Sequence, residues 1–304
     1  AATRQQTVIV IRNLHEQTTY TLAIILKVLD FPKATYHYHL NRMNQPDKDK
    51  DLKNEILDIR KIHKDYGYRR VYAELRRRGH KIGKNKVQRL MKSLKLQVTS
   101  FTRKSRKYNS YKGDIGKIAP NRLKRRFIST IPHQKIVTDT TEFRYYEADD
   151  SGQIQLRKLY LDPFIDLFNM EVVSYKISAQ PNKTSMMAAF KEAVETTSDC
   201  EYRRTFHSDQ GWAYQMNEYQ ELLRDNKIFQ SMSRKGNCLD NAPAENFFGI
   251  MKQEMYYGNV YHSYEALEQA IHNYIRYYNE DRIKEKLGYL SPVEYKKHYA
   301  SLSA

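Results

Sequence analysis

The chain has 304 residues, of which 40% are hydrophobic and 29% are charged, with a net charge of +17. At roughly 100–200 residues per domain, this length predicts two or three domains with a sizeable buried core. No run of about 18 uncharged apolar residues is present, which excludes a membrane-spanning helix of ordinary length. The first residues lack a methionine and an apolar signal segment, so we expect a processed end of a longer product. The only cysteines, Cys200 and Cys238, have no partners at metal-ligand spacing, which predicts a reduced cytosolic protein.

The positive charge is concentrated in the first part of the chain. Residues 1–135 hold 33 Lys and Arg against 10 Asp and Glu, a net charge of +23, and residues 136–304 have a net charge of −6. This asymmetry indicates a polyanionic partner. A cationic membrane-surface domain would need an amphipathic helix with an aromatic or leucine face, which this part lacks. Nucleic acid is the better prediction, and a merely lopsided soluble surface is the alternative.

Two helical segments open the chain. Residues 8–43 show mixed apolar periodicity that Pro32 interrupts, which predicts an N-terminal helical domain over 1–45, either a helix-turn-helix or a packing unit without a DNA role. After a polar linker, residues 50–97 are predicted to form a second helical domain. Its first helix has an apolar face at Leu52, Ile56, Ile59 and Ile62.

The second helical domain has the pattern of a helix-turn-helix. Short helices over 69–78 and 84–94 follow Gly67 and the turn between Gly79 and Gly83. The outer face of the last helix is cationic, which suits a reader of the DNA major groove, although a solvated helix face is the simpler alternative. The candidate DNA contacts in this domain are Arg69, Arg70, Lys84, Lys86 and Arg89.

Residues 98–133 form a basic linker with little apolar periodicity. Such a segment can follow a phosphate backbone, or it can simply connect two domains. Its candidate DNA contacts are Arg103, Lys104, Arg106, Lys107, Arg125 and Arg126.

From residue 136 the pattern changes to strands. Strands are predicted at 136–146, 156–168, 172–177, 204–207 and 228–232, with helices at 185–197 and 214–225 between the later strands. Three strands followed by alternating helices and strands predict an α/β domain with a mixed five-stranded sheet. We place this domain at 134–258, and a C-terminal helical extension, with a helix over 264–278, at 259–304.

Three acidic residues occupy special positions in the α/β domain. Asp139 lies within the first predicted strand, where a carboxylate is costly to bury without a partner such as a metal ion. Asp209 follows a short strand, and Gly211 after it permits a sharp turn. Glu245 lies in the first turn of a helix that Asn241 or Asp240 caps and Pro243 begins. Taken alone, each of these three acidic residues would more often be a surface or capping residue. Asp162, Asp166 and Asp240 are interpreted as structural, and His207 as a packed histidine.

The spacing of these residues resembles a known family signature. Thirty-five residues separate Asp209 from Glu245, and Lys252 follows seven residues later, on the same helix side and roughly 10 Å along the axis. The set resembles the Asp-Asp-35-Glu motif of retroviral integrases and insertion-sequence transposases. Further matches are Val137-Thr138-Asp139-Thr140-Thr141, His207-Ser208-Asp209-Gln210-Gly211 and Asn241-Ala242-Pro243-Ala244-Glu245. The resemblance covers residues 50 to 296 and is closest to the second-reading-frame product (OrfB) of insertion-sequence family three. The sequence departs from that family at two points. Ile136 occupies a position where these enzymes often carry Trp, and no first-frame (OrfA) portion is recognisable.

This resemblance implies a transposase with an RNase H-like catalytic core preceded by helix-turn-helix units. It implies that Asp139, Asp209 and Glu245 are catalytic residues that hold two Mg²⁺ or Mn²⁺ ions, and that Lys252 contacts DNA near the scissile phosphate. The implied partners are the terminal inverted repeats, target DNA, other copies of the chain and a first-frame (OrfA) protein or fusion, in the cytoplasm of a bacterium, associated with the nucleoid. Oxygen-only ligands agree with the preference of Mg²⁺.

Two other functions stay open from the sequence. One is a DNA-binding regulator with an inert core, which the intact triad disfavours. The other is an RNase H-type nuclease acting on RNA–DNA hybrids, which has no need of a basic helical front half.

Overall fold

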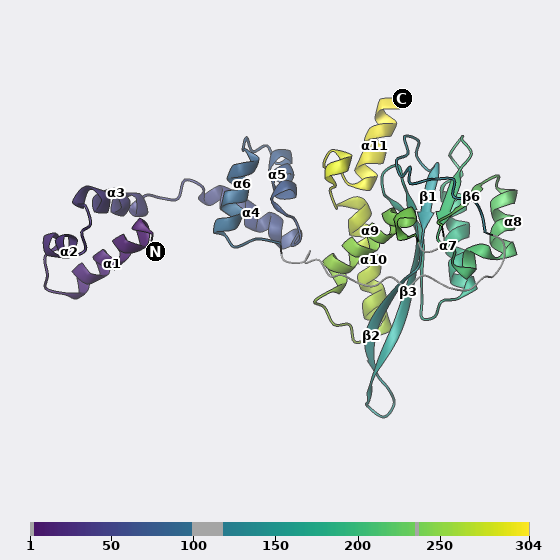
Figure 1. The fold of residues 1–304 in the computed structure, drawn as a ribbon, viewed down its shortest axis with the longest axis horizontal. Coiled ribbons are helices and arrows are strands. Elements are labelled where there is room, and N and C mark those ends of the chain that lie inside the picture. The colour runs from purple at the N-terminus through teal and green to yellow at the C-terminus, as the bar shows by residue number, and fades with distance from the viewer. Residues whose placement is uncertain (1–2, 99–117, 235–236, 304) are drawn as a thin grey trace. The chain divides into compact units, whose positions relative to one another are not determined.

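The computed structural model describes residues 3–98, 118–234 and 237–303, and the chain divides into two compact units, residues 1–61 and 62–304 (Figure 1). Arg103, Lys104, Arg106 and Lys107 of the predicted basic linker lie outside the described residues. None of the described helices combines the length and the apolar composition that a membrane span requires.

The first unit is helical, as predicted, but it contains three helices before the polar linker. Helices α1 (Arg4–Gln17), α2 (Leu22–Val28) and α3 (Lys33–Asn44) enclose a small core, and Pro32 precedes the first residue of α3. The core consists of Val8, Ile11, Ile25, Leu26 and Tyr36. The predicted break at Pro32 is confirmed because proline is compatible with the start of a helix and not with its interior.

Helix α4 (Lys50–Ile62) crosses the boundary between the units, and α5 (Tyr68–Arg77) and α6 (Lys84–Ser93) form the helix pair expected from the sequence. Ile56 and Ile59 of α4 are buried, but Ile62 is 70% exposed, because the apolar stripe ends before the last turn. Val87, Leu90 and Met91 are buried in α6. The turn before α6 contains Gly79 with φ +89°, a backbone conformation that glycine adopts without strain.

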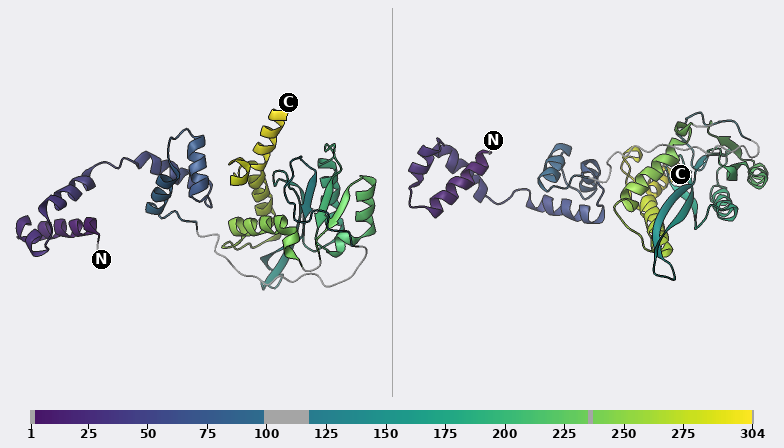
Figure 2. Two further views of the ribbon diagram at one scale, coloured as in Figure 1. Left: turned by 45° about the horizontal axis from the view of Figure 1, so that its top comes forward. Right: turned by 60° about the horizontal axis from the view of Figure 1, so that its bottom comes forward.

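The second unit is built around a mixed sheet with the strand order β2-β3-β1-β5-β6 and β4 paired to the other edge of β3. The strands are β1 (Lys135–Thr138), β2 (Thr141–Ala148), β3 (Ile154–Asp166), β4 (Val172–Ser178), β5 (Thr205–Ser208) and β6 (Phe229–Met232). Strands β1, β5 and β6 are parallel, and β3 is antiparallel to β1, β2 and β4. The hairpin of β2 and β3 extends beyond the helices (Figures 1 and 2).

The predicted first strand appears as two segments, which turns the five predicted strands into six. Val137 pairs with Ile165 in β1, and Thr141 pairs with Leu161 in β2, so both segments follow one continuous register along β3. Asp139 falls between them, opposite Pro163, which has no N–H for the ladder. The sheet therefore opens at the position of the first predicted catalytic residue.

Helices cover both faces of the sheet. Ile136 packs with Phe190 of α7 (Lys183–Thr196) and Leu223 of α8 (Asn217–Asp225), whereas the next residue, Val137, packs on the opposite side. That opposite side is covered by α9 (Ala242–Met251) and α10 (Tyr264–Glu280). Alternation along the strand thus holds two cores in place. A π-helical turn (Lys252–Tyr256) follows α9, and α11 (Pro292–Ser303) ends the described chain.

Candidate active site

Asp139 and Asp209 lie at the same edge of the sheet. Strands β1 and β5 are parallel, and their register pairs Val137 with His207. Each aspartate lies two residues beyond this pair, so the two backbones run side by side, about 5 Å apart. Neighbouring parallel strands present their carboxyl ends at one edge, which brings the two carboxylates together.

Glu245 reaches this edge from the first turn of α9. Asn241 precedes the helix, and Pro243 lies in its first turn, as the sequence predicted. The Asn241 side chain makes no capping hydrogen bond; instead its Nδ2 donates to the carbonyl oxygen of Thr138, at 3.1 Å. This bond ties the start of α9 to the residue before Asp139.

Electrostatic coupling shows that the three carboxylates are neighbours. The pKa of Asp139 is raised well above its ordinary value by burial of the carboxyl group and by the charges of Asp209 and Glu245. Burial also raises the pKa of Asp209 and that of Glu245. In the described part of the chain, no Lys or Arg forms an ion pair with any of the three. The site is therefore a cluster of uncompensated negative charge.

Two backbone N–H groups fix the orientation of the aspartates. The N–H of Thr140 donates to Oδ1 of Asp139 at 2.8 Å, and the N–H of Gly211 donates to Oδ1 of Asp209 at 2.8 Å. Each carboxylate keeps its second oxygen for other contacts. No group of three acidic, histidine or cysteine side chains among the described residues is already arranged to hold a metal ion. The carboxylates are neighbours that still have to turn toward a common ligand.

The residues interpreted as structural are held by hydrogen bonds within the fold. Asp162 accepts a hydrogen bond from the Thr140 hydroxyl at 2.5 Å, and burial raises the pKa of Asp162 to about 6. Asp166 accepts from the backbone N–H groups of His133 and Phe168. His207 is buried between the Ser231 hydroxyl and the carbonyl oxygen of Asp240, so it does not bind Asp209.

Comparison with known proteins shows which family this is. The Integrase core domain family matches residues 129–238 and again residues 245–299, and the HTH-like domain family matches residues 46–105. The putative transposase InsK of insertion sequence element IS150 from Escherichia coli is 43% identical over 91% of this chain and 94% of its own length. The chain belongs to the transposases of insertion-sequence family three. It is thus a DDE enzyme of the polynucleotidyl transferase type with an RNase H-like core.

Two further proteins are similar to the chain. An uncharacterized transposase-like protein of Haemophilus influenzae is 47% identical to this chain. The match covers 71% of this chain and 94% of the relative. Among solved structures, the catalytic core of HTLV-2 integrase, in complex with magnesium, has a TM-score of 0.40 and 18% identity, covering 54% of this chain and 96% of that core.

Lys252 follows directly after α9 and contacts strand β2. Helix α9 ends at Met251, and the π-helical turn that starts at Lys252 changes the direction of the following side chains. The Lys252 ammonium donates to the carbonyl oxygen of Glu142 at 2.8 Å and lies 4.9 Å from the ring centre of Phe143. It therefore lies over β2, a few residues along the chain from Asp139.

The described candidate DNA contacts fall into two groups. Lys84, Lys86 and Arg89 are exposed on the outer face of α6, as predicted. Arg69, Arg70 and Arg125 instead form ion pairs within the transposase, with Glu285 at 3.2 Å, Glu254 at 3.6 Å and Asp240 at 2.9 Å, and Arg126 is exposed. Asp240 is fully buried, and the Arg234 and Arg125 side chains lower the pKa of its carboxyl group.

Gly211 has a role that the sequence reasoning explained differently. Its φ of −59° is ordinary, so the residue is not needed for a strained turn. A Cβ atom there would lie only 2.9 Å from Oδ1 of Asp209. The absent side chain therefore leaves room for the carboxylate, which no local sequence rule reveals.

Replacing Gly211 with alanine should move the Asp209 carboxylate while leaving the fold intact, because the clashing atom is the end of a flexible side chain. We expect strand-cleavage rates to fall about tenfold or more, a barrier increase of roughly 1.4 kcal/mol. The melting temperature should change little. Gly249→Ala is the matched control, since a Cβ at Gly249 meets nothing within 4 Å; equal cleavage rates for the two variants would contradict this role.

Asn241 also has a role that residue type alone did not reveal. Its side chain is 3% exposed, and its Oδ1 is buried without a hydrogen-bond partner among the described residues. Replacing it with aspartate removes the donor to Thr138 and adds a fourth negative charge. We expect a loss of roughly 1–3 kcal/mol in unfolding free energy and a clear loss of cleavage. In contrast, Asn226→Asp, which breaks a similar bond to the carbonyl of Leu222 far from the carboxylates, should lower stability only.

Proposed function

We propose that the transposase cleaves DNA at the ends of its insertion element and joins the freed 3′-hydroxyl to target DNA, with Asp139, Asp209 and Glu245 as its catalytic residues. The observation that supports this most directly is the placement of Asp139 and Asp209 at one sheet edge, where burial and then the charges of Asp209 and Glu245 raise the pKa of Asp139. Such clustering costs stability and is typical of a site that receives cations.

The donor set suits magnesium or manganese. All three candidate ligands are carboxylates, and hard divalent cations prefer oxygen ligands. When bound, two such ions stabilise the attacking and the leaving oxygen of a phosphodiester displacement. Asp139, Asp209 and Glu245 would hold these ions through their carboxylate oxygens.

The protein residues around the carboxylates supply orientation. The Thr140 and Gly211 N–H groups hold one oxygen of each aspartate and leave the second oxygen of each for a ligand. The Asn241 amide fixes the helix that carries Glu245 against β1. This preorganisation reduces the rearrangement needed to bind ions and DNA.

Recognition of the element ends is assigned to residues 50–97. The exposed cations of α6 suit binding of the terminal inverted repeats, with Lys84, Lys86 and Arg89 at phosphates or base edges. Residues 134–258 perform the chemistry, and Lys252 contacts DNA beside the carboxylates. Pairing of two element ends would require more than one copy of the chain, with a first-frame (OrfA) protein as a further partner.

A cleavage assay tests the proposal against both alternatives. Purified transposase is incubated with duplex DNA from its own element end, with Mg²⁺, with Mn²⁺ or with EDTA. We expect strand cleavage only with a divalent ion, and none on an RNA–DNA hybrid of the same sequence. Binding without cleavage would support an inert regulator, and preferential cleavage of the hybrid would support a ribonuclease.

A further inference from the structure

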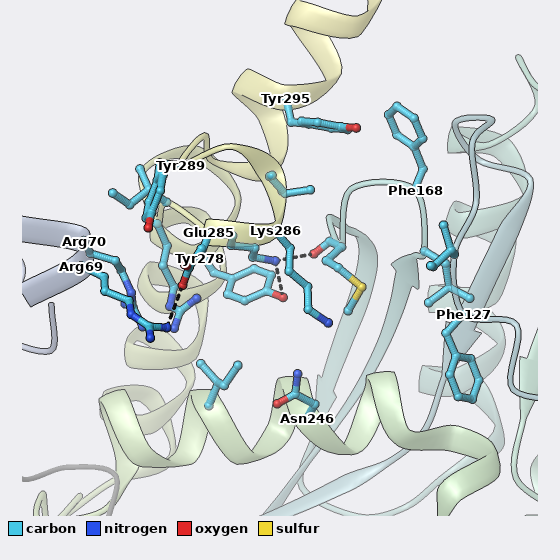
Figure 3. Close-up of a pocket in the computed structure, with 18 of the residues that line it drawn as sticks. Arg69, Arg70, Phe127, Phe168, Asn246, Tyr278, Glu285, Lys286, Tyr289 and Tyr295 are labelled. Atoms are coloured by element: carbon cyan, nitrogen blue, oxygen red, sulfur yellow. Dashed lines mark hydrogen bonds and ion pairs between the residues drawn. The ribbon is translucent and has the colours of Figure 1, made fainter. Parts of the chain in front are cut away.

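A cavity of about 1030 Å³ lies next to the catalytic helix and is not part of the carboxylate site. Asn246 and Ile250 of α9 form one side, and residues 127–130, 167–170 and 278–299 contribute most of the rest (Figure 3). Asn246 directly follows Glu245 in the sequence. The cavity therefore adjoins the helix turn that carries the third carboxylate.

The charge of the cavity is positive and only partly compensated. Five cationic and two acidic side chains line it. Three of the cations are paired: Arg69 with Glu285, and Arg70 and Arg282 with Glu254. Lys284 and Lys286 form no ion pair within the described residues. Lys286 thus offers an exposed ammonium group to an anion, whereas burial holds the pKa of Lys284 well below its ordinary value and leaves its amine as a hydrogen-bond donor.

These two lysines differ in how they are held. The Lys284 amine donates to the Tyr278 hydroxyl at 2.7 Å and to the carbonyl oxygen of Met170 at 3.2 Å. Lys286 is exposed and makes no side-chain hydrogen bond with any described residue. In Figure 3, Lys286 and Asn246 extend into the same space from opposite sides. The hydrogen-bonded amine of Lys284 and the exposed ammonium of Lys286 therefore line the same cavity as the Asn246 amide, which makes no hydrogen bond with a described residue.

The remaining walls are apolar and aromatic. Ile128 is 80% exposed, and Phe127 beside it is half-buried and packs in part against the core of the second unit, so both leave apolar surface on the cavity wall. Duplex DNA presents phosphates and closed base pairs, which do not match such a surface. An unpaired nucleotide combines a phosphate, a flat apolar base and a polar base edge, which matches an ammonium group, an aromatic wall and an amide.

We propose that this cavity binds one unpaired nucleotide of the DNA strand that enters the active site, with Lys284 and Lys286 at its phosphate, Phe127 against its base and Asn246 at the base edge. This assignment rests on the proposed function, because it requires DNA at the carboxylates. It adds a binding site for a base that leaves the duplex next to the cleavage point.

Binding of a short fluorescein-labelled oligothymidylate tests the assignment. The full chain carrying Asp139→Asn is titrated and followed by fluorescence anisotropy. Combining Phe127→Leu with Lys286→Ala should weaken binding about tenfold, since stacking and a phosphate contact are lost while packing is kept. Lys297→Ala, which removes an exposed lysine outside the cavity, should change it less than twofold.

Two further probes separate the parts of the interaction. An abasic oligonucleotide of the same length should bind the unsubstituted cavity more weakly than oligothymidylate, and Phe127→Leu should not weaken it further. A hairpin duplex should bind with equal affinity to the Asp139→Asn chain and to the same chain that also carries Phe127→Leu and Lys286→Ala. Equal weakening for duplex and single strand, or unchanged oligothymidylate binding in the double variant, would overturn the assignment. A failed cleavage assay leaves these binding results intact, so the two proposals fail separately.

Discussion

Replacing Asp139 with asparagine is expected to reduce metal-dependent strand cleavage by roughly three orders of magnitude or more, which corresponds to about 4 kcal/mol of lost transition-state stabilisation. The substitution keeps the shape of the side chain and its hydrogen bond from the Thr140 N–H but removes the charge that holds divalent ions. DNA binding should be unchanged, because the helix pair α5 and α6 does not contain this residue. Cleavage rates and binding affinity measured on the same element-end duplex check both statements.

The same variant should be more stable than the original protein at neutral pH without metal. The pKa of Asp139 is raised in the folded state, so the fold loses stability as the pH rises from the ordinary value of 3.8 to the raised pKa. Asparagine removes this cost, and the difference should shrink as the pH falls and Asp139 becomes protonated. Adding Mg²⁺ should raise the melting temperature of the original protein and have little effect on the variant.

Asp150→Asn is the control for this pair of experiments, because Asp150 is exposed in the turn between β2 and β3. It should leave cleavage and melting temperature unchanged. Near-normal cleavage by Asp139→Asn, or a lower melting temperature than that of the original protein in EDTA, would remove Asp139 from the catalytic site.

Replacing Glu254 with glutamine should destabilise the transposase by roughly 3–5 kcal/mol, because it leaves the buried Arg282 without a counter-charge. The Arg282 guanidinium donates two hydrogen bonds to the Glu254 carboxylate, both 2.7 Å long, and the side chains are 5% and 3% exposed. The Tyr274 hydroxyl donates a third bond to the carboxylate, at 2.9 Å. Urea unfolding followed by circular dichroism measures the loss.

The matched control is Glu192→Gln, which breaks the surface pair of Lys176 and Glu192 and should cost less than about 1 kcal/mol. Equal losses of unfolding free energy for the two variants would show that the buried pair stabilises the protein no more than the surface pair does. Burial alone would raise the pKa of Glu254, but Arg282 lowers it below its ordinary value of 4.5. The contribution of this pair is therefore present above that pH and is lost as the pH falls through the lowered pKa.

Much of the second unit was predictable because its elements carry strong local signals. The apolar periodicity of α7 and the Asn241 and Pro243 positions at the start of α9 predicted helices that the structure confirms. The break between β1 and β2 was not predictable from residues 136–146, which are uniformly strand-forming. The break lies opposite Pro163 of β3, so locating it requires the register between β1, β2 and β3.

The sequence predicted the carboxylates of the candidate site but not the contacts made by the residues around them. Spacing alone selected Asp139, Asp209 and Glu245, whose roles stay a prediction. The hydrogen bond of Lys252 to the carbonyl oxygen of Glu142 joins α9 to β2, and the spacing of residues along the chain does not reveal it. The ion pair of Arg125 with Asp240 joins a segment interpreted as a DNA-tracking linker to a buried carboxylate, and only tertiary structure reveals such a pair.

The parallel pairing of β1 with β5 has a consequence for synthesis on the ribosome. Helices α5 and α6 are complete before β1 is translated, whereas Asp139 must wait for β5 and then for α9 before its two partners exist. Parallel pairing between distant segments also forms slowly compared with local helix packing. A nascent or truncated chain therefore has its helix pair long before it has an assembled carboxylate cluster, and incomplete copies of the enzyme would occupy DNA without cutting it.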